Sequence, residues 1–303
     1  ALVVHSQLLA RSRLQREQTH LRSTELRRAA EDGARAALQR LADDPDLQAD
    51  HSNETWAVSE ELVTPLGIST LVRVDDENRL FDLNNLRATI SPGQRRPDDI
   101  LMDLMTLCGD FTPSLRVNAL TDFVDADDAG PRESDFYERQ DPPQRCPNRV
   151  LYSWAEVMNV EGWTRELFAR HTRSRLPGSF DANLTDCVTV LPVPRERPLP
   201  LNVNTASREV LIGVLGVGQE YLVNTIITLR ALKPIRNLEP LAVLSEPDYF
   251  ESVRPYLAVH SSFFRIQARA YAEGRTAILD VLASRTADGH VDILAWQFSP
   301  TAG

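Results

Sequence analysis

Several features that would point to common protein classes are absent or scarce in this 303-residue chain. No run of about 18 apolar residues occurs, so the given sequence predicts no membrane-spanning helix. Lys233 is the only lysine, arginine carries the positive charge, and the net charge of −10 argues against broad binding to nucleic-acid phosphates. No P-loop, GxGxxG, GxSxG or HExxH motif is present and the histidines are scattered, so we predict a protein without catalysis.

Cysteine is also scarce, with only Cys108, Cys146 and Cys187. No CxxC pair occurs, which excludes a zinc ribbon and a thioredoxin-like motif. In an oxidising compartment two of the three thiols could pair and leave one over. Three buried free thiols are an equally good interpretation, and the sequence does not decide between them.

The most prominent positive feature is a long amphipathic pattern from Ser6 to Leu41. Apolar residues recur mostly at steps of three, four or seven, and charged residues lie between them, as in an α-helix with one apolar face. Asp43-Asp44-Pro45 ends the pattern, because proline and the residue before it resist helical geometry. A coiled-coil segment or a bundle helix is the alternative interpretation. A helix of this length needs a broad surface to pack against.

Strand-like alternation occurs near both ends of the chain. Residues 68–74 predict a strand and residues 80–83 a short return strand, while residues 263–298 predict three antiparallel strands with turns at Glu273-Gly274 and Asp288-Gly289. Neither group is wide enough to cover the long helix alone. We therefore predict an α+β fold in which both groups form one antiparallel sheet under the helix.

This arrangement predicts a discontinuous domain, residues 1–84 with 259–303, interrupted by a mostly α-helical domain over residues 85–258. Within the insertion, the sequence predicts a polar loop over Asp125 to Gln144, an extended linker from Val188 onward, and several helices. These helices lie at 100–107, 114–124, 153–158, 161–171, 205–232 and 238–244.

The unit at residues 201–232 resembles a helix-hairpin-helix, which offers a competing function in DNA binding or DNA uptake. Its turn, Gly216-Val217-Gly218, is followed by Gln219-Glu220, and no arginine or lysine lies between the turn and Arg230. Because phosphate binding needs positive charge, this composition favours a packing role for the hairpin.

Several distinctive motifs occur in order along nearly the whole chain: Asp76 to Leu86, Leu120 to Asp128 with Glu133 and Tyr137, Leu201 to Ala206, and Ser262 to Ile266. Together they resemble the minor pseudopilin K family of the type II secretion system, also called general secretion pathway protein K. Phe123 departs from the family pattern, which usually has Trp there, and Pro131-Arg132 replaces a Gly-Ala pair.

The resemblance implies a pilin-like domain whose sheet is interrupted by a large helical domain. It implies a place at the tip of the periplasmic pseudopilus, together with the minor pseudopilins I and J. There the resemblance implies that the protein caps the assembly or starts it, and that it meets the folded proteins exported across the outer membrane. The family's hydrophobic N-terminal half-helix, which anchors it in the inner membrane, is missing from this sequence. We expect Leu9, Leu14 and Leu21 of the long helix to contact partners.

An acidic segment follows residue 124, and its candidate metal ligands are Asp125, Asp127, Asp128, Glu133 and Asp135. Carboxylates at this density repel one another, and a hard cation with oxygen ligands relieves the repulsion. The segment begins like an EF-hand loop, but its twelfth position is Phe136 instead of Glu. The family resemblance implies structural Ca²⁺ in the inserted domain. The alternative is a solvated acidic loop whose aspartates cap helices.

Overall fold

The computed structural model describes residues 2–169 and 182–299, and side chains within residues 20–168 and 182–299. The chain forms two compact units. The sheet unit comprises residues 1–47, 52–76 and 262–303, and the inserted unit comprises residues 48–51 and 77–261. The boundaries of the sheet unit therefore fall at 76 and 262, whereas the sequence predicted 84 and 259.

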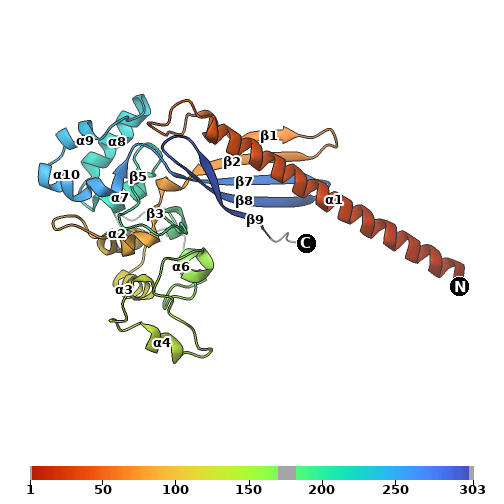
Figure 1. Ribbon diagram of the computed structural model, residues 1–303, viewed down its shortest axis with the longest axis horizontal. Helices are drawn as coiled ribbons and strands as arrows, with labels where there is room; N and C mark the ends of the chain where they lie inside the picture. The colour runs from red at the N-terminus through yellow and green to blue at the C-terminus, as the bar shows by residue number, and fades with distance from the viewer. Residues whose placement is uncertain (1, 170–181, 300–303) are drawn as a thin grey trace. The chain divides into compact units, whose positions relative to one another are not determined.

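The sheet unit consists of one long helix, α1 (Leu2–Ala42), packed on a five-stranded antiparallel sheet (Figure 1). The short 3-10 helix η1 (Thr55–Ala57) lies between α1 and the first strand. The N-terminal part of α1 runs on beyond the strands (Figure 1). The strands, in their order across the sheet, are β1 (Glu60–Val63), β2 (Ser69–Asp76), β7 (Phe263–Ala272), β8 (Arg275–Arg285) and β9 (Val291–Phe298).

Alternating side chains explain how the helix and the sheet meet. In β7 every second residue from Phe264 to Ala272 is buried, as expected for a strand with one covered face. Trp56 adds an edge-to-face contact with Phe264, with ring centroids 5.1 Å apart. The buried face of α1 is rich in small residues, which allow close approach: Leu26, Ala29, Ala30, Ala34, Ala37 and Leu41.

The three predicted C-terminal strands are confirmed, and β2 lies in the same sheet. β2 pairs with β7 along its full length, from Ser69 opposite Tyr271 to Asp76 opposite Phe264. Strands from the two ends of the chain thus lie side by side. The α+β fold predicted for the chain is confirmed.

The predicted short strand within residues 80–83 is present, but its predicted return alongside residues 68–74 is wrong. Phe81–Asp82 forms β3, which pairs in parallel with β4 (Val188–Thr189) inside the inserted unit. β2 pairs instead with β1, which the sequence analysis did not identify. The chain leaves the sheet because Glu77–Arg79 forms a 3-10 helix whose side chains bond within the inserted unit, as Asn78 does with the carbonyl of Pro200.

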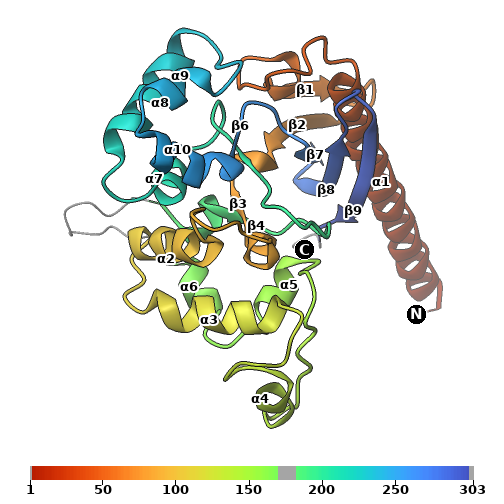
Figure 2. The ribbon, with the colours of Figure 1, turned by 60° about the vertical axis from the view of Figure 1, so that its left-hand side comes forward.

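The inserted unit has its own hydrophobic core, formed mainly by short helices (Figure 2). The structure differs from the sequence prediction by adding α4 and α10 and by placing β4 where a linker was expected. The last residues of the predicted helix 161–171 lie outside the described residues. The unit contains η3 (Leu83–Arg87), α2 (Pro97–Leu107), α3 (Pro113–Val124), α4 (Ser134–Glu138), α5 (Trp154–Val157), α6 (Arg165–Ala169), η4 (Leu184–Asp186), β5 (Leu201–Asn202), α7 (Arg208–Leu215), α8 (Glu220–Leu232), α9 (Glu239–Val243), α10 (Pro247–Val253), η5 (Arg254–Tyr256) and β6 (Leu257–Ala258).

The predicted helical hairpin is present as α7 and α8. The Ser207 side chain caps α7 by accepting a hydrogen bond from the Val210 amide, and Gly216 turns the chain at φ +106°. Gly213 lets α7 approach α2 closely, since a Cβ at this position would lie 2.1 Å from the Leu104 Cδ2 atom. The hairpin therefore packs into the core of the inserted unit.

A candidate metal centre in the inserted unit

Three carboxylates converge where α3 ends and α4 begins. Asp122 lies in the last turn of α3, Asp125 directly follows this helix, and Glu133 directly precedes α4. One oxygen of each side chain lies within 4.8 Å of the oxygens of the other two. The C-terminal end of α3 adds partial negative charge from its free carbonyls, so the helix itself does not neutralise the group.

The intervening turn holds the chain close to α3. The Arg132 amide donates a hydrogen bond of 2.9 Å to the Asp122 Oδ2 atom. Gly130 lies against the same carboxylate, and a Cβ at this position would come within 2.5 Å of Asp122 Cγ. The chain can therefore bring Glu133 back to the end of α3 only because residue 130 has no side chain.

Burial makes this carboxylate group costly without a partner. Glu133 is only 4% exposed, and both of its carboxylate oxygens are buried without a hydrogen-bond donor. The Asp125 Oδ1 atom is in the same condition. Buried charges of one sign normally require an opposite charge or a coordinated metal. Oxygen ligands of this kind fit a hard cation such as Ca²⁺.

The electrostatics of the group lead to the same interpretation. Burial, followed by the nearby Asp125 and Asp122 carboxylates, raises the pKa of Glu133 to about 7. Burial and the neighbouring Asp127 and Asp122 carboxylates raise the pKa of Asp125. In both cases the charged form is disfavoured by removal from water and by like charge, and a bound cation would reverse both effects.

The five predicted ligands have different environments. The structure brings Asp125 and Glu133 together with Asp122. The Asp127 Oδ1 atom accepts a hydrogen bond from the Ala129 amide, and the Asp128 Oδ1 atom accepts one from the Ser134 amide.

Asp135 points to solvent. Its side chain is 82% exposed and pairs with the Arg139 guanidinium at 2.8 Å. Asp122 was not among the predicted ligands. It lies on α3, where nothing in the local sequence separates it from an ordinary solvated aspartate.

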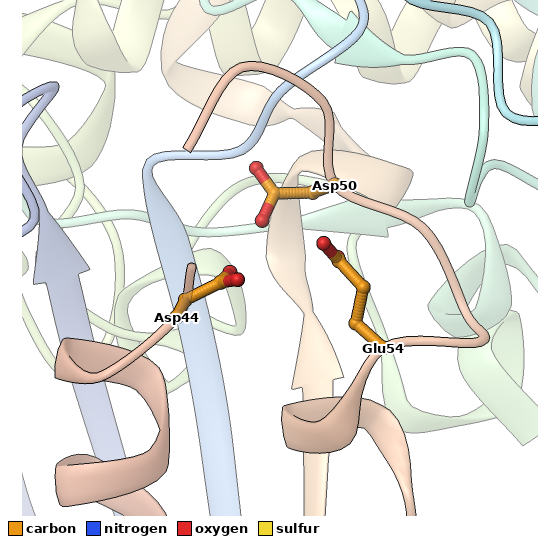
Figure 3. A group of neighbouring side chains, drawn as sticks. All are labelled: Asp44, Asp50 and Glu54. Atoms are coloured by element: carbon orange, nitrogen blue, oxygen red, sulfur yellow. The ribbon is translucent and has the colours of Figure 1, made fainter. Parts of the chain in front are cut away.

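Figure 3 draws three further carboxylate side chains, Asp44, Asp50 and Glu54, on the connection between α1 and β1. Each has a partner within its own unit. Asp44 pairs with the buried Arg285 at 2.7 Å, and Glu54 accepts a hydrogen bond from the Trp56 indole at 2.8 Å. Asp50 accepts a backbone hydrogen bond of 2.6 Å within the inserted unit. These contacts account for the three carboxylates as structural groups.

The residues predicted to contact partners belong to α1. Leu21 is 62% exposed on this helix. Leu9 and Leu14 are helical, but their side chains lie outside the described residues. None of the helices that the structure describes is both long enough and apolar enough to span a membrane.

The fold defines a class of protein. A long N-terminal helix packed on an antiparallel sheet is the pilin-like architecture, and here the sheet is interrupted by a large helical unit between β2 and β7. The inserted unit and its carboxylate group distinguish this chain from a simple pilin-like domain.

Comparison with known proteins specifies this class further. Residues 79–174 match the family model described as type II secretion system (T2SS), protein K. The chain is 27% identical over 179 residues to the putative type II secretion system protein K of Escherichia coli strain K12. That match covers 56% of this chain and about half, 53%, of the relative.

A solved structure has the same fold. A chain of the crystal structure of the GspK-GspI-GspJ complex from the enterotoxigenic Escherichia coli type 2 secretion system matches with a TM-score of 0.72. The match covers 94% of this chain and 99% of that chain at 18% sequence identity. Together these matches confirm the resemblance to the protein K family that the sequence motifs indicate.

Proposed function

We propose that this chain is the periplasmic part of a minor pseudopilin of the type II secretion system, and that its role is assembly without catalysis. The observation that carries the proposal is the nested fold: the same helix, sheet and insertion recur over 94% of the chain in a component of the GspK-GspI-GspJ complex. We further propose that I-type and J-type minor pseudopilins are its partners. The inserted unit would cap the tip of the pseudopilus or start its assembly during export of folded proteins across the outer membrane. Anchoring in the inner membrane would require a hydrophobic segment preceding α1.

The helical hairpin does not favour the competing role in DNA binding. The Gly218 amide, at the turn where a phosphate would bind, donates a hydrogen bond to the Glu220 carboxylate at 3.4 Å. The Arg230 guanidinium donates to the backbone carbonyls of Val203 and Ala206 inside the unit. The hairpin thus presents an acidic group at its turn and uses Arg230 for packing.

Co-purification with the soluble domains of I-type and J-type minor pseudopilins tests the proposed assembly. We expect a stable complex with the wild-type chain and a weaker one with Leu21→Arg, because this change places a charge on the exposed side of α1. Leu66→Arg is the matched control, since Leu66 is 59% exposed in the sheet unit but lies in the β1–β2 turn. Absence of a complex with the wild-type chain would contradict the proposed partners.

We also propose that Asp122, Asp125 and Glu133 hold a structural Ca²⁺ ion in the inserted unit, with Asp127 and Asp128 as neighbouring acids. The orphaned oxygens of Asp125 and Glu133 support this assignment, because a cation would supply the charge that no protein donor supplies. When bound, the ion would neutralise the group and stabilise the turn between α3 and α4.

Thermal unfolding in calcium and in chelator tests the metal assignment. We expect calcium to raise the melting temperature of the wild-type chain by several degrees, and Glu133→Gln to abolish most of this rise. Asp135→Asn makes the same chemical change at the exposed Asp135 and should leave the rise intact. Equal melting temperatures of the wild-type chain in calcium and chelator would exclude the ion.

A further inference from the structure

Two of the three cysteines meet in the core of the inserted unit. The Sγ atoms of Cys108 and Cys187 are 3.8 Å apart, although 79 positions separate the residues in the sequence. Both residues are thiols in the structure, and both are buried. The contact therefore joins the end of α2 to the start of β4.

We propose that Cys108 and Cys187 form a disulfide when the chain folds in an oxidising compartment, and that Cys146 stays a thiol. The compartment is part of the function proposed above, whereas the pairing rests on the geometry of the inserted unit. An S–S bond is about 2.05 Å long, so the sulfur atoms must approach by roughly 1.8 Å.

Local backbone structure at both residues can accommodate this movement. Cys108 is the residue after α2, at φ −80° and ψ 10°, and Cys187 is the residue after η4, at φ −114° and ψ −24°. Neither residue lies in the interior of a helix. The Cys187 carbonyl, which accepts the amide of Phe81, anchors the start of the β3–β4 pair and keeps Cys187 beside the end of α2.

Cys146 occupies a different part of the unit. Its thiol faces the backbone carbonyls of Asp122 and Phe123, at 3.6 and 3.8 Å. The sulfur atoms of Cys108 and Cys187, by contrast, face each other. Cys146 is therefore the member of the three that we expect to stay unpaired.

The reaction is a two-step thiol–disulfide exchange with an external disulfide, either a protein oxidant or glutathione disulfide. A thiolate of one cysteine attacks a sulfur atom of the oxidant, forming a mixed disulfide and releasing one thiolate. The thiolate of the second cysteine then attacks the sulfur atom of the first cysteine, which forms the Cys108–Cys187 bond and releases the remaining half of the oxidant as a second thiolate. The two cysteines lose two protons and two electrons, and the oxidant is reduced to two thiols.

Burial determines when this exchange takes place. The contact with Cys108 and removal from water raise the pKa of Cys187 far above its ordinary value, so the folded dithiol reacts slowly. Oxidation should accordingly precede closure of the core. Once formed, the bond should resist reducing agents until the inserted unit opens.

The bond would enclose the acidic segment and helices α3 to α6 within one loop. A crosslink across a loop of this length restricts the unfolded chain and thereby stabilises the folded one. We expect the melting temperature of the oxidised chain to exceed that of the reduced chain by roughly 5–15 °C.

Refolding of the purified chain in a glutathione redox buffer, followed by alkylation under denaturing conditions and peptide mapping, tests the pairing. We expect one linked pair of peptides containing Cys108 and Cys187, with Cys146 alkylated. Cys146→Ser is the matched control and should keep the linked pair, while Cys108→Ser and Cys187→Ser should each lose it. A folded wild-type chain with three alkylated cysteines, or a bond that includes Cys146, would overturn the proposal. Because the buffer supplies the oxidant, failure to bind pseudopilins would not affect this result.

Discussion

Glu133 shows how a single side chain can link pH to the stability of the inserted unit. Without a cation its pKa lies near 7, above the ordinary value of 4.5, because the buried carboxylate faces other acids. A raised pKa of an acid means that the neutral form is favoured in the folded state. The protonated Glu133 side chain therefore makes its full contribution to the stability of the folded chain below about pH 4.5, and this contribution is lost as the pH rises through 7.

This linkage predicts a pH-dependent effect of Glu133→Gln in chelator. Since glutamine stays neutral, the variant should melt at nearly the same temperature as the wild-type chain at pH 5, and at a higher temperature at pH 8. With calcium present at pH 8 the order should reverse, because the wild-type carboxylate can bind the ion. Melting curves at both pH values provide the measurement, with Asp135→Asn as the control. A pH-independent difference in chelator would contradict the raised pKa.

The sequence indicated two of the three converging carboxylates and missed the third. Asp125 and Glu133 belong to a visibly acidic stretch, so the density of charge was sufficient to single them out. Asp122 lies within α3, where a lone aspartate is typical of a solvated helix face. Its role depends on the turn at Gly130 that folds residue 133 back onto the helix, and this tertiary contact has no local sequence pattern.

Among the elements, α1 and its sheet depend on close approach at Gly33. A Cβ at this position would lie 2.8 Å from Val72 Cγ2 and 3.0 Å from Thr70 Cγ2. Both neighbours are β-branched residues of β2, whose side chains have few alternative rotamers. The glycine therefore sets the distance between the helix and the sheet.

We expect Gly33→Val to lower the free energy of unfolding of the sheet unit by about 1–3 kcal/mol, the usual range for overpacking a core. Ala36→Val is the control, because Ala36 is exposed on the same helix. Helix propensity alone would make valine an improvement at residue 33 and a slight loss at residue 36. Denaturant unfolding of both variants, monitored by tryptophan fluorescence, separates the effect of packing from that of helix propensity. If the Gly33→Val chain unfolded with a higher free energy than the Ala36→Val chain, close packing at residue 33 would not determine the stability of the sheet unit.

Elements with strong periodicity were predictable, whereas their partners were not. The three C-terminal strands follow clear alternation with Gly-containing turns, and α1 follows an apolar stripe. Residues 80–83 have the same local alternation whether they pair with β2 or with a distant strand. Long-range contacts, such as the parallel pairing of Phe81 with Val188, decided the outcome.

On the scale of the whole molecule, the nested arrangement could be predicted because neither strand group could cover the long helix alone. The first and last residues of the insertion could not be predicted, because they depend on which unit each side chain forms hydrogen bonds with. Glu77 and Asn78 resemble turn residues in sequence, yet both are buried within the inserted unit. The chain thus passes from the sheet unit to the inserted unit at residue 77, where the hydrogen-bond partners change but the amino-acid composition does not.

The adjacency of β2 and β7 also sets an order of events during synthesis. These neighbouring strands are separated in the chain by the whole of residues 77–261, so the sheet has high contact order. A ribosome makes the inserted unit before it makes any of β7, β8 or β9. Until the last strands emerge, only β1 and β2 are available to cover the apolar stripe of α1. A nascent chain interrupted before residue 263 would therefore carry a complete inserted unit together with a helix whose apolar stripe is mostly exposed and prone to aggregation.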